Sequence, residues 1–169
     1  PLQADIDRRW PGELAVAAAV AAFPELERQE VPQQRRCSYF CHQDAVTPAL
    51  VEAARALGCE VMYSASRYLD LLPAGVNKGS TLQALVDQLG IAHDEVLVAG
   101  DTLNDLAMFE AGFQGVCVGD SEAALLAATS DLTHVFHADA AGCGGILQAI
   151  IHFSLLQPGY LDATTCSAA

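Results

Sequence analysis

Positively charged residues are scarce in this sequence of 169 residues. Eight lysines and arginines stand against 21 aspartates and glutamates, which gives a formal net charge of −13 at pH 7. A protein that binds nucleic acid needs a basic face, and an anionic membrane surface also attracts basic segments. The charge balance therefore argues against both kinds of partner. An anionic small molecule stays compatible with the chain if a metal cation and a basic side chain reverse the charge locally.

Long hydrophobic runs are also missing. The longest, Leu14–Phe23, has ten residues, which is about half of what a membrane-spanning helix requires. We interpret it as an alanine-rich buried helix that ends before Pro24. Apolar residues still make up 52% of the chain, so the sequence predicts a packed core and not a disordered segment.

The six cysteines do not have the spacing of a metal site. Cys37 and Cys41 lie four residues apart and precede His42, which leaves a zinc site as an alternative. However, Cys37, Tyr39 and Cys41 alternate as the residues on one face of a strand do. We therefore expect buried free thiols, and free thiols indicate a reducing, cytoplasmic environment.

The pattern of predicted elements changes near residue 74. Helices and strands over 1–74 indicate an α+β unit, whereas short apolar strands alternate with helices over 75–158, which is typical of a parallel sheet. Residues 159–169 are interpreted as a tail or linker. The predicted helices are Gly12–Phe23, Pro48–Leu57, Ser80–Leu89, Leu103–Ala111, Ser121–Thr129 and Gly144–Leu155. The predicted strands are Cys37–His42, Glu60–Ser64, Tyr68–Leu72, Val96–Ala99, Gly115–Val118 and His134–His137. The fold class that follows is α/β.

Polar chemistry is concentrated directly after one predicted strand. Val96–Ala99 predicts a buried strand that Gly100 ends, and two carboxylates and a carboxamide follow: Asp101, Asn104 and Asp105. In open parallel sheets, ligands bind at the carboxyl edge of the strands. Oxygen ligands suit a hard cation such as Mg²⁺, and the N-terminus of the next helix favours phosphate. The segment therefore predicts a site for a metal ion and a phosphate group.

The only lysine of the chain points to the same chemistry. Lys78 lies just before a predicted helix, and in a chain that uses no other lysine a solvated surface role is a weak explanation. Lys78 followed by Gly-Asp-Thr-Leu-Asn-Asp at residues 100–105 resembles the third and fourth motifs of the haloacid dehalogenase (HAD) superfamily of phosphatases. Tyr63–Pro73 and Asn77-Lys78-Gly79 are similar to its branch of sucrose-phosphate, mannosyl-3-phosphoglycerate and glucosylglycerol-phosphate phosphatases. Gly144–Ile150 resembles the closing helix of that branch.

The resemblance implies a fold, a reaction and a set of residues. The fold is part of a HAD-like Rossmannoid core over 75–158 and an α+β cap over 1–74. The reaction is Mg²⁺-dependent hydrolysis of a phosphorylated glycoside, similar to sucrose 6-phosphate or glucosylglycerol phosphate. The implied catalytic residues are Lys78, Asn104 and Asp105, and the implied metal ligands are Asp101 and Asp105. The implied sugar contacts in the cap are Gln33, Gln34, Arg36, Arg67 and Asp70.

Two motifs of the superfamily are absent: the nucleophile loop, and the serine or threonine motif that follows it before the cap. These phosphatases carry a D-x-D-x-[TS] loop whose first aspartate is the nucleophile. Asp5-Ile6-Asp7 has the D-x-D spacing, but Arg8 follows it and no apolar strand precedes it, so we interpret it as a chance match. We expect the nucleophile to lie in a segment outside this chain, and we expect the 169 residues alone to be inactive.

Simpler explanations remain open for each residue. Asp101 is also a good helix cap, Asp105 a first-turn helix stabiliser and Asn104 a turn residue, and the polar cap residues suit a solvated surface. For the whole chain, the main alternative is a non-catalytic domain that binds or senses a sugar phosphate. A receiver-like phosphoacceptor is disfavoured because no acidic pair lies near the N-terminus. Fusion to a glycosyltransferase domain is a further expectation that the sequence leaves open.

Overall fold

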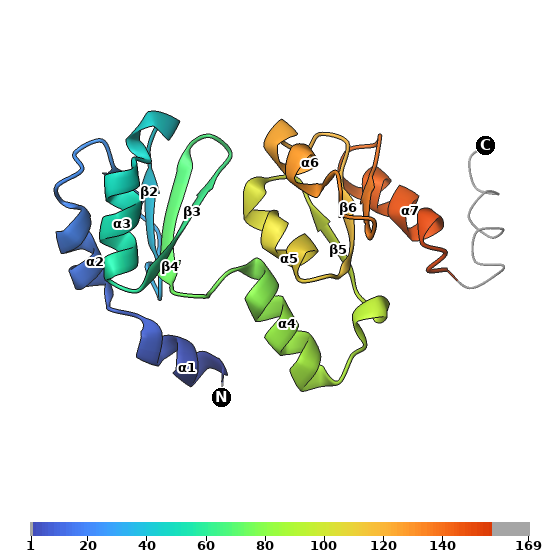
Figure 1. The fold of residues 1–169 in the computed structure, drawn as a ribbon, viewed down its shortest axis with the longest axis horizontal. Coiled ribbons are helices and arrows are strands. Elements are labelled where there is room, and N and C mark those ends of the chain that lie inside the picture. The colour runs from blue at the N-terminus through green and yellow to red at the C-terminus, as the bar shows by residue number, and fades with distance from the viewer. Residues whose placement is uncertain (1, 157–169) are drawn as a thin grey trace.

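The computed structural model describes residues 2–156, which form two units joined in succession (Figure 1). The α-helices are α1 (Leu2–Arg9), α2 (Glu13–Val20), α3 (Pro48–Ala56), α4 (Lys78–Leu89), α5 (Leu106–Glu110), α6 (Ala123–Thr129) and α7 (Gly142–His152). The strands are β1 (Glu27–Arg28), β2 (Cys37–Phe40), β3 (Cys59–Ser64), β4 (Tyr68–Pro73), β5 (Leu97–Gly100), β6 (Gln114–Cys117) and β7 (Val135–His137). Short 3₁₀ turns are η1 (Gln43–Ala45), η2 (His93–Glu95) and η3 (Leu103–Asp105).

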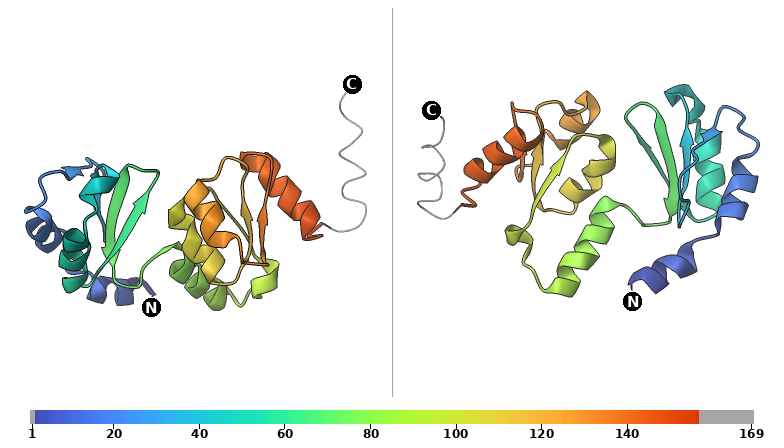
Figure 2. Two further views of the ribbon diagram at one scale, coloured as in Figure 1. Left: turned by 45° about the horizontal axis from the view of Figure 1, so that its top comes forward. Right: turned by 180° about the vertical axis from the view of Figure 1, so that it is seen from behind.

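The first unit is an antiparallel sheet with helices on one face. Its strand order is β1-β2-β4-β3, and α2 and α3 lie on the side away from the second unit (Figures 1 and 2). Alternate strand residues face these helices and are buried, among them Tyr39, Leu69 and Leu71. Ser38 and Asp70 belong to the opposite face, where they are direct partners in the register of β2 and β4. The sheet thus has one apolar face and one face that carries polar side chains.

Local sequence signals explain the helix in this unit. The Thr47 side chain accepts a hydrogen bond of 3.3 Å from the Leu50 amide, and Pro48 occupies the first turn. Both features are standard at helix N-termini. The predicted burial of the thiols is confirmed for Cys37, Cys41, Cys59 and Cys117, but it is wrong for Cys143, which is free and exposed.

The second unit is a parallel sheet in the order β5-β6-β7. Helices α4, α5 and α6 lie on one side of it and α7 lies on the other (Figures 1 and 2). The core between the sheet and the first set of helices contains Val98, Phe109 and Phe113. A smaller cluster under α7 contains Val116 and Ala149. The predicted α/β class is therefore confirmed.

One glycine brings the two helices next to the site into close contact. A Cβ atom on Gly79, in the first turn of α4, would overlap the backbone carbonyl of Ala107 in α5. No residue larger than glycine fits there without moving one of the helices. The backbone beside Lys78 is therefore fixed by the approach of two helices.

Several features of the fold differ from the sequence predictions. The expected buried helix over 14–23 is α2, which ends at Val20 and leaves Leu14 85% exposed. Helix α1 and the two-residue strand β1 were not expected; α1 has a polar sequence with no buried residue, so it lacks the apolar periodicity that indicates a helix. The predicted buried strand Val96–Ala99 is β5 shifted by one residue, and Ala99 is exposed. The reason is that β5 is an edge strand and α7 packs mainly against β6. Parallel sheets are normally covered on both faces, so the face at Ala99 is unusual.

The predicted boundary near residue 74 falls between β4 and α4, where the sheets change. The predicted tail at 159–169 lies outside the described residues. Within residues 2–156, no helix combines the length and apolar character needed to cross a membrane.

Candidate active site

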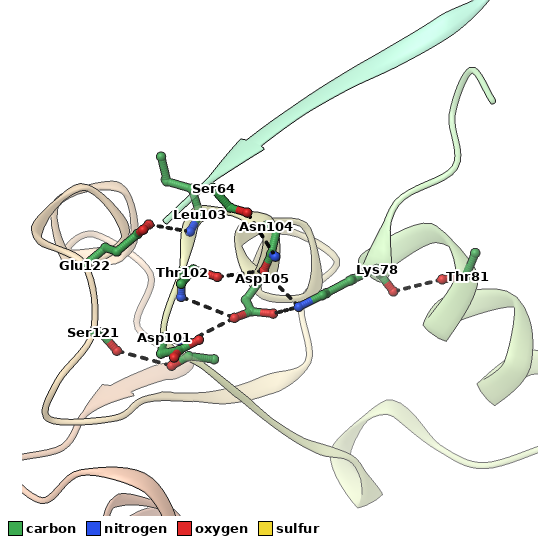
Figure 3. A network of polar contacts seen from close by, with 11 residues as sticks. Ser64, Lys78, Thr81, Asp101, Thr102, Leu103, Asn104, Asp105, Ser121 and Glu122 are labelled. Carbon is green, nitrogen blue, oxygen red and sulfur yellow. Dashed lines mark hydrogen bonds and ion pairs between the residues drawn. The ribbon is translucent and has the colours of Figure 1, made fainter. Parts of the chain in front are cut away.

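The polar residues that the sequence singled out meet at the carboxyl end of β5 (Figure 3). The loop from Asp101 to Asp105 leaves this strand and enters α5 through the turn η3. The N-terminus of α4 approaches from one side with Lys78, and the hairpin of β3 and β4 approaches from the first unit with Ser64. The site is therefore assembled from both units.

Asp105 is the buried centre of the site, with 4% of its surface exposed. Its Oδ2 accepts hydrogen bonds from the amides of Asp101 (3.0 Å) and Thr102 (3.3 Å). Its Oδ1 accepts a hydrogen bond from Lys78 Nζ, with which it also forms an ion pair. Gly100 makes room for this side chain, because a Cβ atom at Gly100 would lie 2.5 Å from the Asp105 Cβ. Asp105 thus closes the loop on itself and holds the lysine.

Lys78 is the first residue of α4, two residues earlier than the predicted start of that helix. Asn77 caps the helix and forms a capping box with Ser80, which explains the earlier start. Besides Asp105, Lys78 Nζ donates to Asn104 Oδ1 at 2.8 Å. An ammonium group has three donors, and half of this side chain is exposed (49%). One donor therefore remains for a ligand, at a helix N-terminus that itself favours anions.

Asp101 differs from Asp105 in that its carboxylate is exposed. Its backbone takes part in the loop, since the Asp101 carbonyl accepts from the Glu122 amide at 2.8 Å, but its carboxylate makes no hydrogen bond or ion pair within residues 2–156. No group of three histidine, cysteine, aspartate or glutamate side chains gathers around a common point in that range either. Asp101 is thus the free carboxylate of the loop, whereas both oxygens of Asp105 have partners. The metal roles of Asp101 and Asp105 stay predictions.

Sequence reasoning missed Glu122, the residue before α6. Its Oε2 accepts from the Leu103 amide at 2.9 Å (Figure 3), and its Oε1 accepts from the amide of Ala65, in the hairpin of the first unit, at 2.8 Å. A signal was available: Glu122 lies in the polar turn after β6, the neighbour of β5. The carboxyl ends of adjacent parallel strands meet at one edge, so both turns belong to the same site.

The predicted sugar contacts are distributed unevenly over the first unit. Asp70 lies on the polar face of its sheet and accepts a hydrogen bond from Ser38 Oγ. Gln33 is committed to the loop before β2, because its side chain donates to the Gln29 carbonyl at 2.9 Å and accepts from the Ser38 amide at 2.9 Å.

The other three predicted contacts are exposed. Gln34 and Arg36 precede the Cys37 end of β2, whereas the hairpin that meets the second unit lies at the opposite end of the sheet. Arg67 is at that hairpin, and its guanidinium lies 4.5 Å from the centre of the Phe40 ring. The structure thus brings Lys78, Asn104 and Asp105 together and does not bring Gln34 or Arg36 near them. Their roles in binding sugar stay predictions.

Cysteine chemistry is not available at the site. Cys117 is a buried thiol at the end of β6, where it pairs with Gly100 in the register of β5 and β6. Burial raises the pKa of Cys117, and the negative charge of Asp105 raises it further. The thiol is therefore kept protonated and is a poor nucleophile.

Comparison with known proteins decides between the families that share this architecture. The family model of sucrose-6F-phosphate phosphohydrolases matches residues 1–154. The chain belongs to this family. A sucrose-phosphatase from Synechocystis sp. PCC6803, solved with sucrose and phosphate, superposes with a TM-score of 0.79 at 26% identity, over 89% of this chain and 65% of that protein. The resemblance to HAD phosphatases is thereby confirmed.

Two relatives in sequence carry different names. A glucosylglycerol-phosphate synthase from Pseudomonas anguilliseptica is 59% identical over 92% of this chain and 21% of its own length. A mannosylfructose-phosphate phosphatase from Agrobacterium fabrum is 37% identical over 86% of this chain and 60% of its own length. The chain therefore spans between about one fifth and three fifths of these relatives.

Proposed function

We propose that the chain contributes the cap and part of the core to a Mg²⁺-dependent phosphatase that hydrolyses a phosphorylated glycoside. The substrate would resemble sucrose 6-phosphate or glucosylglycerol phosphate. Family membership supports the reaction class, and the observation that carries the proposal is the lysine site. Asn104 and Asp105 hold Lys78 Nζ at the end of β5, and one N–H donor of the ammonium group remains for a ligand.

In this proposal, Lys78 neutralises charge on the phosphate. Phosphoryl transfer depends mainly on alignment and on compensation of charge over the phosphate oxygens. Asp105 orients the ammonium group, and Asn104 sets its direction from the other side. The two backbone amides bound to Asp105 keep that carboxylate from turning toward the substrate. Helix α4 thus presents the ammonium group to the ligand, while the loop keeps the Asp105 carboxylate turned away from it.

Magnesium is the second part of the proposal. The exposed Asp101 carboxylate at the strand end suits it, because Mg²⁺ usually takes only one or two protein carboxylates and fills its other positions with water and substrate oxygens. When bound, the ion would supply further positive charge beside the phosphate. Asp105 Oδ1, whose one partner within residues 2–156 is Lys78, would contact such an ion through its remaining lone pair.

The attacking carboxylate is proposed to come from a strand outside this chain. Strand β5 has an open edge in the described sheet, Ala99 is uncovered, and Leu85 and Leu89 of α4 are exposed, so apolar surface is available for such a partner. An aspartate there would attack the phosphorus atom, the bond from phosphorus to the sugar oxygen would break, and water would then hydrolyse the aspartyl phosphate. Asp5 and Asp7 are poor substitutes, because both are paired with arginines: Asp5 with two arginines of α1, and Asp7 with Arg35 of the segment before β2.

Sugar selection is assigned to the cap. Asp70 offers a half-buried carboxylate on the polar face of its sheet, where it accepts from the buried Ser38 hydroxyl, and sugar hydroxyls need partners of this kind. Arg67 is available at the hairpin end. Gln33, Gln34 and Arg36 are retained as further candidates in the proposal, with Gln33 acting through the loop that it braces.

The second candidate function is a non-catalytic domain that binds a sugar phosphate within a larger enzyme. One observation favours it: the relative with 59% identity is called a synthase, and the matched part covers 21% of that protein. A glycosyltransferase domain on the same polypeptide would fit this arrangement in either case. The two candidates differ in whether an aspartate nucleophile completes the site.

Phosphate release by the full-length protein distinguishes the candidates. The assay uses sucrose 6-phosphate and glucosylglycerol phosphate as substrates, with Mg²⁺ and with a chelator in its place. A phosphatase releases phosphate from at least one of them only with Mg²⁺, whereas a binding domain releases none. The isolated 169-residue chain is the control, for which we expect negligible turnover. Robust turnover by the isolated chain would refute the placement of the nucleophile outside it.

A further inference from the structure

We infer that Glu122 is a clasp that fixes the position of the cap relative to the loop 101–105. Its two carboxylate oxygens accept from backbone amides of different units: Oε1 from Ala65 in the hairpin of the cap at 2.8 Å, and Oε2 from Leu103 in the core loop at 2.9 Å. One side chain of the core therefore bridges the cap and the loop that carries the candidate catalytic residues.

Glu122 does not make the hydrogen bond that is usual for a residue at the start of a helix. It stands at the N-cap of α6, where a side chain usually accepts from an amide of its own helix, but it makes no such bond. It has no cationic partner within residues 2–156 either. Its negative charge is compensated by the two amides that it bridges, and hydrogen bonds to a charged acceptor are the stronger kind.

The hairpin turn that receives Glu122 is strained. Ala65 and Ser66 both have a φ of +49°, a left-handed conformation that residues other than glycine seldom adopt. The Arg67 amide donates to the Ser64 carbonyl at 3.2 Å and closes the turn. Strain of this kind persists where surrounding contacts determine the conformation. In this turn, the Ala65 amide points out of the cap and meets the Glu122 carboxylate.

A second contact lies beside the clasp. Asn104 Nδ2 is 3.5 Å from Ser64 Oγ, so the same hairpin also touches the residue that orients Lys78. The cavity next to it, of about 330 Å³, is lined from the cap by Tyr63 and Ser66 and from the core by Leu103 and Glu122. Loss of the clasp should therefore leave this long contact as the remaining side-chain hydrogen bond between the hairpin and the loop within the described residues, and it removes no group that touches Lys78.

Amide exchange in the ¹⁵N-labelled 169-residue chain tests the clasp without relying on catalysis. In Glu122→Ala, we expect the amides of Ala65 and Leu103 to exchange at least about tenfold faster, because each loses a charged acceptor. In Glu122→Gln, only one of the two should lose protection, since the carboxamide retains one acceptor oxygen and turns an NH₂ group toward the other amide. Asp120→Asn is the control: it removes one negative charge at a nearby exposed position, and it should leave the exchange rates of both amides unchanged.

Residual dipolar couplings on the same samples report the orientation of the cap relative to the core. We expect one alignment tensor for both units in the unmodified chain and two different tensors in Glu122→Ala. The clasp is refuted if both amides keep their exchange rates, or if they lose protection while the units keep one tensor. It is also refuted if the paired strand residues Tyr63 and Leu69 lose protection equally, because Glu122 would then support the hairpin itself and not its placement.

Discussion

The ion pair between Lys78 and Asp105 gives the sharpest quantitative prediction. Replacing Lys78 with methionine keeps the length of the side chain and removes the charge beside a carboxylate that is only 6% exposed. Leaving a buried charge unpaired costs about 3–5 kcal/mol. Two features reduce that cost here: Lys78 is half exposed, so solvent screens the pair, and Asp105 keeps two backbone donors. We therefore expect Lys78→Met to lower the free energy of unfolding by about 1.5–3 kcal/mol.

A double-mutant cycle isolates the pair from other effects of the change. Asp105→Asn removes the charge on the partner, and the double variant should be more stable than the sum of the two single losses predicts, by about 1–2 kcal/mol. Urea unfolding followed by far-ultraviolet circular dichroism measures all four proteins. Arg55→Met, at an exposed position of α3, is the control and should change stability by less than about 0.5 kcal/mol. A coupling below about 0.5 kcal/mol would refute the view that Asp105 holds the lysine in place.

Three further predictions concern the metal, the sugar and the thiols. In the full-length protein, Asp101→Ala should reduce Mg²⁺-dependent phosphate release by at least about a hundredfold. The melting temperature should shift by less than about 2 °C. If the variant instead unfolds and the fraction that stays folded is active, Asp101 is a helix N-cap and not a metal ligand. Asp70→Ala and Arg36→Ala should each lower kcat/KM for a disaccharide phosphate by an amount equivalent to about 1–3 kcal/mol and leave a small aryl phosphate nearly unaffected; equal losses on both substrates would exclude sugar recognition. Burial raises the pKa of Cys37 from 9.0 to about 11, so the folded state binds that proton more tightly and this stabilisation is lost as pH rises through that range. The free energy of unfolding, measured in urea, should therefore fall between pH 9 and 11, and it should fall less steeply with pH in Cys37→Ala. Equal pH dependence in the two proteins would contradict the raised pKa of Cys37.

The sequence was sufficient wherever local chemistry determines structure. Thr47 and Pro48 mark the start of α3 through capping rules, and the alternation of Cys37, Tyr39 and Cys41 marks the buried face of β2 and of the residue after it. The meeting of Lys78 with Asn104 and Asp105 was expected from the resemblance to the phosphatase motifs, and the position of Asn104 and Asp105 also follows from the end of a parallel strand. These features needed no knowledge of packing at a distance.

What the sequence could not supply depends on contacts between segments far apart. One carboxylate oxygen of Asp105 binds Lys78 and the other binds two loop amides, and this pairing is seen only in the folded loop. The turn after β6 places Glu122 at the edge of the site, but its partners, Ala65 and Leu103, offer backbone amides, which no side-chain pattern reveals. The exposure of Ala99 follows from what packs on β5, and an apolar run reveals only that a strand is present.

The open edge of β5 has a consequence for handling the chain in solution. An unpaired strand presents free N–H and C=O groups to any other extended backbone, and proteins usually protect such edges with charge, proline or a bulge. The residues of β5 are Leu-Val-Ala-Gly, which offer none of these protections. Two copies of the isolated chain can therefore join edge to edge at high concentration, and the negative charge of the protein is what opposes this association. Low ionic strength, which preserves that repulsion, is the condition in which the chain should stay monomeric.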